Sequence, residues 1–410
     1  MPDLPIRRNT FLLSASLAAN SGMLQLSAAV SSLTLVLVVG VEGLLGLGPA
    51  IVLASGALAA LPAGRLMDRI GRVPVIAGGF VLGGTGGTLA AIGCSTDSAP
   101  LVLAGLVGVG ASSGTSLLAR TAAGDMYPPS HRARGIALVL FGAVFGAILG
   151  PAVFSPLLAG KDLDGDSLAV LWFASVGFMV VAVVLVLFVR PDPRRIAELL
   201  HTHPDAEQPP AAPLREIVRR PGVIPALLAG QASFGVMVGL MTLTGAVVVD
   251  HHGHAASNVF PIIGAHVVGM YALVLVIGEV IDRIGRTPAL AGGLLIMALA
   301  SISLLWVTGV AVTAVALFTL GIGWNLSFVA ATAQLADCAE PWERGKLLGF
   351  NDLLSGTTGA GLALLGGVAL SAIGVAALAL GGTVLVVVPA LWILRRPRYT
   401  RANPPSEAMT

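Results

Sequence analysis

The sequence predicts an all-helical membrane protein, and two observations lead to that fold class. Of the 410 residues, 56% are hydrophobic and only 11% are charged, so a soluble fold would have too few polar side chains to cover its surface. The apolar runs also continue for about 20 residues, the length of a helix that crosses a bilayer, and do not alternate as barrel strands do. Lipid is therefore the expected solvent and helices are the expected elements.

Twelve spans, six in each half, are the simplest interpretation of the apolar runs. The first half holds spans at residues 10–38, 43–63, 73–95, 99–123, 132–159 and 166–190. The second half holds spans at residues 222–250, 256–281, 287–308, 310–336, 344–372 and 374–395. The predicted organisation is an N-terminal six-helix bundle at 1–190, a polar cytoplasmic linker at 191–221, a C-terminal six-helix bundle at 222–398 and a polar tail at 399–410.

A charged motif occurs once in each half and indicates an internal duplication. Its two copies are Gly64, Asp68, Gly71 and Arg72, and Gly278, Asp282, Gly285 and Arg286. A second set also recurs in order, with Asp125, Pro129, Arg132 and Arg134 matched by Asp337, Pro341, Arg344 and Lys346. Duplicated apolar halves are typical of transporters. Within each copy we expect the glycines to allow close helix approach, and the aspartate and the later Asp125 or Asp337 to pair with the arginine.

The distribution of basic residues predicts the orientation. In the predicted loops only Lys161 lies on the face opposite to the other lysines and arginines. The positive-inside rule therefore places both termini and the linker in the cytoplasm. We expect the protein to lie in the cell inner membrane. The net charge of +2 then reflects topology and not nucleic-acid binding. The sequence has no phosphate-binding Gly-Lys-Ser/Thr loop and no catalytic triad or zinc motif in its loops, so we expect neither an enzyme nor a bound cofactor. A monomer in the lipid bilayer is expected.

Soft metal ligands are concentrated in the seventh and eighth spans. Met237 and Met241 are four residues apart, as are His266 and Met270, so each pair shares a helix face. Counted from the connecting loop, the two pairs lie at matching depths of ~15 and ~20 Å. Thioether and imidazole ligands favour Cu(I), so these four residues form a candidate metal site. The alternatives are that the methionines are apolar filler and that His266 makes a structural hydrogen bond.

The duplicated charged motif resembles the signature loop of the major facilitator superfamily, which lies between the second and third helices and again between the eighth and ninth. The resemblance implies the twelve-helix major facilitator fold, with a central cavity in which Gln25 and Asn325 contact the solute. Amide bonds between helices are the alternative for these two residues, and Trp324 can either stack on an aromatic solute or pack. The resemblance also implies that the charged motifs are latches that close the cytoplasmic side in one state and break in the other; topological anchoring is the alternative.

Two further segments resemble particular branches of the superfamily. Gly142, Gly146 and Gly150, followed by Pro151, resemble part of an antiporter motif, although this spacing also suits plain helix packing. The Met-x-x-x-Met and His-x-x-x-Met pairs resemble the CcoA-like copper importers, and riboflavin-type members carry similar residues. We therefore expect a secondary active transporter that works by alternating access. Its substrate is either Cu(I) or an organic solute such as a riboflavin-like vitamin or a drug; a non-transporting receptor is the rival class.

Overall fold

A computed structural model describes residues 4–39, 47–158, 164–200, 211–254 and 258–396. Most of these residues are helical, with no strand among them, as the sequence predicts. In the first half the helices are α1 (Ile6–Val39), α2 (Leu47–Ile70), α3 (Arg72–Ser95), α4 (Ala99–Leu117), α5 (Ala119–Met126), α6 (Arg132–Leu140), α7 (Gly142–Leu158) and α8 (Gly165–Leu187). A short 3₁₀ turn, η2 (Pro129–His131), precedes α6.

The second half repeats this order. Its helices are α11 (Val223–Ala246) with the π-helical turn η3 (Val247–His251), α12 (Val259–Tyr271), α13 (Val274–Ile284), α14 (Arg286–Ser303), α15 (Val310–Asp337), α16 (Arg344–Ile373) and α17 (Val375–Leu394). The predicted linker contains two short helices, α9 (Pro193–Leu199) and α10 (Leu214–Arg219). The predicted tail at 399–410 and Lys161 lie outside the described residues.

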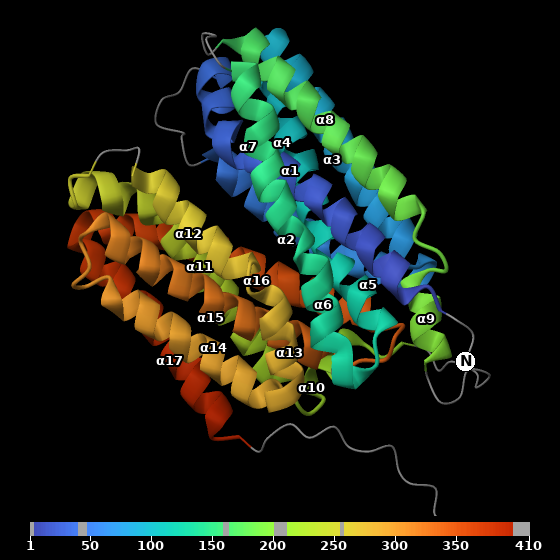
Figure 1. The fold of residues 1–410 in the computed structure, drawn as a ribbon. Helices are drawn as coiled ribbons and strands as arrows, with labels where there is room; N and C mark the ends of the chain where they lie inside the picture. The colour runs from blue at the N-terminus through green and yellow to red at the C-terminus, as the bar shows by residue number, and fades with distance from the viewer. Residues whose placement is uncertain (1–3, 40–46, 159–163, 201–210, 255–257, 397–410) are drawn as a thin grey trace, which may run out of the picture.

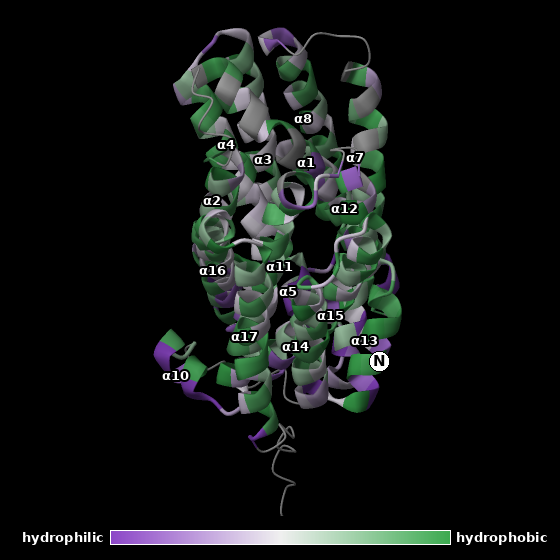
Figure 2. Cartoon of the chain, turned by 90° about the vertical axis from the view of Figure 1, so that its left-hand side faces the viewer, coloured by the Kyte–Doolittle hydropathy of each residue, from purple (hydrophilic) through white to green (hydrophobic). Residues whose placement is uncertain are grey.

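Ten or eleven candidate membrane-spanning segments are found among the described residues, which is consistent with the twelve predicted. Ten helices, counting α4 with α5 and η2 with α6 and α7 as single spans, are long and apolar enough to cross a bilayer. The pair α12 and α13, bent by 41°, adds an eleventh. The 34-residue α1 occupies the position of the first predicted span. Figure 2 shows apolar residues along the bundles, whereas hydrophilic ones are concentrated near their ends and in α10.

The two halves form separate bundles that lie beside each other, one coloured blue to green and the other yellow to red in Figure 1. Their main contacts join α2 to α16 and α6 to α13. Glycines permit the close approach: a Cβ atom at Gly64 would lie 2.0 Å from the carbonyl oxygen of Gly345, and one at Gly278 would lie 2.7 Å from Cβ of Ala137. The helices that carry the charged motifs are therefore the ones that join the halves.

The charged motif is mostly helix and not, as expected, mostly turn. The second and eighth spans were predicted to end at residues 63 and 281, but α2 continues to Ile70 and α13 to Ile284. The chain turns only at Gly71 (φ 103°) and Gly285 (φ 88°), where a side chain would be strained. Hydropathy marks where a helix leaves the lipid, while the backbone hydrogen bonds continue beyond that point.

The glycines of the fifth span serve helix packing. A Cβ atom at Gly142 would lie 1.9 Å from the carbonyl oxygen of Ser14, and one at Gly146 would lie 2.2 Å from that of Ala18. The glycine face of α7 is therefore seated on the backbone of α1, which favours the packing alternative for this motif.

Candidate functional site: ion pairs between the halves

The first charged motif forms a buried ion-pair cluster. The Arg72 side chain is fully buried, and its Nε atom lies 2.7 Å from Oδ2 of Asp125. Its Nη1 atom lies 2.9 Å from Oδ1 of Asp68. We call Asp68, Arg72 and Asp125, together with Arg344 of the second half, the first cluster. Both carboxylates that the sequence offers to Arg72 therefore bind it.

The first cluster also joins the two halves. Asp68 accepts hydrogen bonds from the backbone amides of Gly345 (2.9 Å) and Lys346 (2.6 Å), at the start of α16. The guanidinium of Arg344 donates to Asp125 at 2.6 Å, and Arg72 donates to the carbonyl of Pro341. A carboxylate at a helix N-terminus is stabilised by the unpaired amides and by the helix dipole. The N-terminus of α16 is thus held by a side chain of α2.

The second cluster consists of Asp282, Arg286 and Asp337, with Arg132 from the first half, and repeats this geometry. Arg286 binds Asp282 at 2.6 Å and Asp337 at 3.1 Å. Asp282 accepts from the amides of Ala133 (3.3 Å) and Arg134 (3.0 Å), at the start of α6. Arg132 donates to Asp337.

The first cluster lies where α2 meets α16, and the second lies where α6 meets α13. We call the side of the molecule that holds both clusters the charged end. In each cluster the carboxylates of one half hold the amides and an arginine of the other, so the halves cannot separate at the charged end without breaking both sets of bonds. The sequence predicted the pairs within each copy. It did not predict the bonds between copies.

A third ion pair between the halves was missed by the sequence analysis. The Nη2 atom of Arg120, in α5, donates to Oδ1 of Asp352, in α16, and the Arg120 side chain is fully buried. The guanidinium carbon also lies 4.5 Å from the centre of the Phe328 ring, in α15. One signal for this pair was present in the sequence, because Arg120 is an arginine inside an apolar span, where a charge is costly unless it has a partner.

The Phe328 ring beside this third pair belongs to a group of aromatic side chains. The rings of Trp324 and Phe328 are stacked, with centres 4.7 Å apart and an interplanar angle of 16°. Tyr271 meets Trp324 edge-on at 6.1 Å, and Phe234 lies 6.0 Å from Phe328. Three helices of the second half therefore contribute rings to one aromatic group, and the Phe328 ring of this group lies against the guanidinium of Arg120.

Several buried polar atoms near this group lack a hydrogen-bond partner among the described residues. They are Nε and Nη1 of Arg120, Oδ2 of Asp352, Oδ1 of Asn351, Oγ of Ser355 and Nε1 of Trp324. Buried polar groups in folded proteins are nearly always paired with protein or water. This concentration of unpaired atoms between the halves indicates a region that takes up water or a polar ligand.

The predicted Met and His residues lie on two helices that both pack on α15. His266 is buried, and its Nδ1 atom lies 2.8 Å from the carbonyl oxygen of Leu317 in α15, while its Nε2 atom has no partner among the described residues. Met237 and Met270 are buried and Met241 is half-buried. The helices α11 and α12 contact α15 more extensively than they contact each other.

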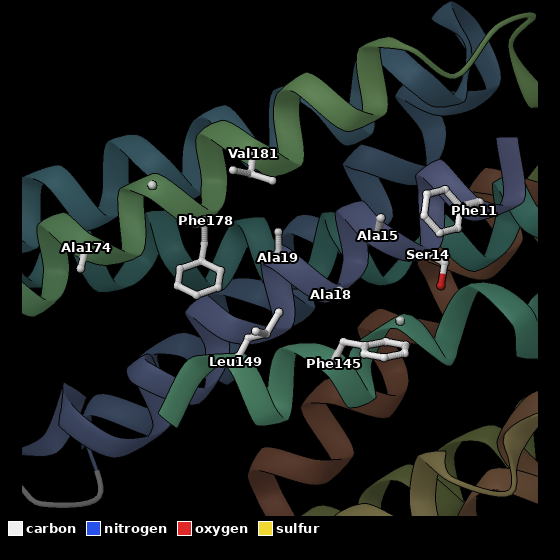
Figure 3. A pocket seen from close by; sticks show the side chains of 12 residues that line it. Phe11, Ser14, Ala15, Ala18, Ala19, Phe145, Leu149, Ala174, Phe178 and Val181 are labelled. Carbon is white, nitrogen blue, oxygen red and sulfur yellow. The ribbon is translucent and has the colours of Figure 1, made fainter. Parts of the chain in front are cut away.

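A large apolar pocket of about 710 Å³ lies between α1, α7 and α8. Figure 3 shows the rings of Phe11, Phe145 and Phe178 around a floor of small residues such as Ala15 and Ala18. The pocket is lined by no charged side chain, and Phe11 and Phe145 are exposed. It is a groove of the lipid-facing perimeter and is separate from the polar region between the halves.

Comparison with known proteins decides the family. The sequence profile of the Major Facilitator Superfamily matches residues 9–338 and, in a second alignment, residues 261–409. The chain belongs to the Major Facilitator Superfamily. It is therefore a multi-pass membrane transporter and not an enzyme.

Two relatives show how far this similarity extends. The chain is 30% identical over 393 residues to an uncharacterized MFS-type transporter, YdeG, of Bacillus subtilis strain 168, which covers 92% of this chain and 89% of that protein. It is 32% identical over 298 residues to the riboflavin transporter RfnT of Brucella anthropi, and 73% of each chain is covered.

Solved structures share the fold of this superfamily member. The human organic anion transporter MFSD10 matches with a TM-score of 0.75 at 16% identity, covering 95% of this chain and all of the other. The proton:xylose symporter XylE matches with a TM-score of 0.76 at 15% identity, covering 95% of each chain. At these identities the likeness concerns the fold alone.

The two amides predicted to contact the solute of this transporter have neighbours on other helices. Asn325 is fully buried and its Nδ2 atom donates to the carbonyl of Met270, so it ties α15 to α12. Gln25 is half-buried and lies beside α7, because a Cβ atom added at Gly150 would lie 3.2 Å from the Cβ atom of Gln25. The bond made by Asn325 favours the helix-to-helix alternative for that residue, although its Oδ1 atom remains without a partner among the described residues.

Proposed function

We propose that this chain moves a small solute by alternating access and that the structure is the state closed at the charged end. The observation that carries the proposal is the presence of two clusters, each made from both halves, at one end of the molecule. The basic residues support placing the charged end in the cytoplasm of a cell inner membrane, so this state would be open outward. The clusters then act as latches that break when the halves rock. A monomer contains both latches and needs no second copy.

We further propose that the solute is organic and contains a planar ring. The Trp324 ring, stacked on Phe328 and with Tyr271 beside it, offers an aromatic surface against which a planar group can bind. The identity to a protein named as a riboflavin transporter supports the same class of solute.

Import of Cu(I) is the second candidate, and the geometry of His266 favours it. When Nδ1 donates to the Leu317 carbonyl, the ring is fixed in the tautomer whose Nε2 atom carries a free lone pair, which is the form that binds metal. Met237 and Met270 offer soft ligands on two helices that both pack on α15, and Met241 lies one turn from Met237. Under this proposal copper is the transported substrate and not a resident cofactor.

Uptake into vesicles that contain the purified protein separates the two substrates. We expect uptake of labelled riboflavin to fall at least tenfold in Trp324→Ala and to be unchanged in His266→Ala. If copper is the substrate, Met237→Ala and His266→Ala lose copper uptake, whereas Met297→Ala, a buried methionine of α14, retains it. Failure of wild-type vesicles to accumulate either substrate would reject both assignments while leaving the family membership intact.

A further inference from the structure

The Arg120–Asp352 pair departs from the internal duplication. Arg120 precedes Asp125 by five residues, and the residue five before the matching Asp337 is Thr332. Asp352 follows Arg344 by eight residues, and the residue eight after the matching Arg132 is Leu140. The two clusters are therefore properties of the repeated fold, whereas this pair is present once and belongs to the particular chemistry of this chain.

The hydrogen bonding of the pair is incomplete. An arginine stays charged at all physiological pH values and offers five N–H donors, yet in the described residues the Nε and Nη1 atoms of Arg120 have no acceptor. Its counter-ion, Asp352, belongs to the other half and leaves its own Oδ2 atom unpaired. A guanidinium without water is strongly stabilised by a bidentate anion, and here it has a single bond to one.

The guanidinium is also part of a stack of planar groups. Arg120 lies 4.5 Å from the Phe328 ring, which in turn is stacked on Trp324 at 4.7 Å. The indole Nε1 atom of Trp324 is a further buried donor without a partner among the described residues. Unpaired N–H donors thus lie at both ends of an aromatic stack, and this combination matches a ligand that has both a flat ring and an anionic group.

Opening of the charged end must separate this pair, because α5 and α16 belong to different halves. Separation takes Asp352 away and leaves the Arg120 charge without its counter-ion, which is unfavourable in a low-dielectric site. A negatively charged group on the solute would remove that cost. A ligand shifts an equilibrium only by binding one state more tightly, and an anionic solute would do so here.

We propose that Arg120 binds an anionic group, a carboxylate or phosphate, of a planar aromatic solute, and that this group displaces Asp352. The inference rests on the proposed transport of an organic solute and names its charge. It assigns Arg120 a direct contact with the solute and Asp352 the role of exchangeable counter-ion.

Matched probes test the proposal on the full-length protein in lipid nanodiscs. Riboflavin and flavin mononucleotide share one ring system and differ by a phosphate, and nicotinamide and nicotinate differ by a carboxylate. We expect at least one anionic probe to bind tenfold or more tightly than its neutral partner. Arg120→Gln should abolish that preference, and Asp352→Asn should increase affinity for the anion severalfold, because it frees the guanidinium. The double variant, Arg120→Gln with Asp352→Asn, leaves no unpaired charge and checks that loss of binding is not loss of folding.

Any of the following outcomes would overturn the inference: no anionic probe binds better than its neutral partner, the preference survives Arg120→Gln, or Asp352→Asn weakens anion binding. The affinity of a neutral probe could also depend on pH in the wild-type protein but not in Asp352→Asn. That result would mean that a proton, and not an anionic solute, displaces Asp352 from Arg120, and it would reject the inference. Riboflavin binding that is lost in Trp324→Ala, without any preference for anions, would keep the proposed function and reject only this inference.

Discussion

Replacing Asp68 by asparagine tests the role of the first cluster with the smallest possible change. The variant keeps one side-chain oxygen and the size of the side chain. It removes the charged carboxylate that accepts hydrogen bonds from the backbone amides of Gly345 and Lys346. A hydrogen bond to a charged group contributes about 1.5–3 kcal/mol and a neutral one about 0.5–1.5 kcal/mol. Gly345 donates to Oδ1 and Lys346 to Oδ2, and asparagine keeps only one acceptor oxygen, so one bond is weakened by about 1 kcal/mol and the other, about 2 kcal/mol, is lost. The total of about 3 kcal/mol lowers the ratio of closed to open states on the order of 100-fold.

Hydrogen–deuterium exchange in nanodiscs measures this shift directly, because the two amides are themselves the donors. We expect peptides that begin α16 to exchange faster in Asp68→Asn, and solute transport to be lost although the protein remains folded. Glu279→Gln is a matched control, since Glu279 lies in the equivalent motif but forms an exposed pair with Arg283. Unchanged exchange at the start of α16, or full transport by Asp68→Asn, would refute the latch role.

Further predictions concern the contact between the halves and the linker. Gly64→Ala should favour the open state, because its Cβ atom would lie 2.0 Å from a backbone oxygen of α16. Gly78→Ala is the control, since nothing lies within 4 Å of a Cβ atom there, and it should leave hydrogen–deuterium exchange at the start of α16 unchanged. Equal exchange in the two variants would reject the packing argument. Burial opposes ionisation of Glu343, but hydrogen bonds from Arg220 and the Ala212 amide outweigh it, so its pKa lies below the ordinary 4.5. The stability this carboxylate gives to linker docking should therefore be present above pH 4.5 and be lost as the pH falls through the lowered pKa. Proteolysis of the linker at about pH 7 and through a series of pH values below 4.5 checks this, and an acid response that persists in Glu343→Gln would contradict it.

The two clusters have the same arrangement because the sequence that forms them is duplicated. Each cluster places an aspartate from the end of one helix at the N-terminus of a helix in the opposite half, so one repeated sequence supplies both the carboxylate and the amides it needs. Two copies therefore lock each other, and a single half could not form either set of bonds.

Local chemistry by itself determined that the chain is helical and where most of its spans lie. Apolar runs of bilayer length must be helical in lipid, so the spans at 310–336 and 344–372 differ from α15 and α16 by one residue at one end. The duplicated motif likewise identified Arg72 and Arg286 as partners of specific aspartates, and both arginines bind those aspartates in the structure.

Only the tertiary structure decided which half each charged group binds. Repetition makes the two halves alike in sequence, so it cannot show that Asp68 holds the start of α16 and not that of α6. The same holds for His266, whose partner is a backbone carbonyl that no residue type marks, and for Arg120, whose counter-ion lies in the other half. Hydropathy and helical spacing are fixed by neighbouring residues, whereas these contacts depend on how two bundles meet in space.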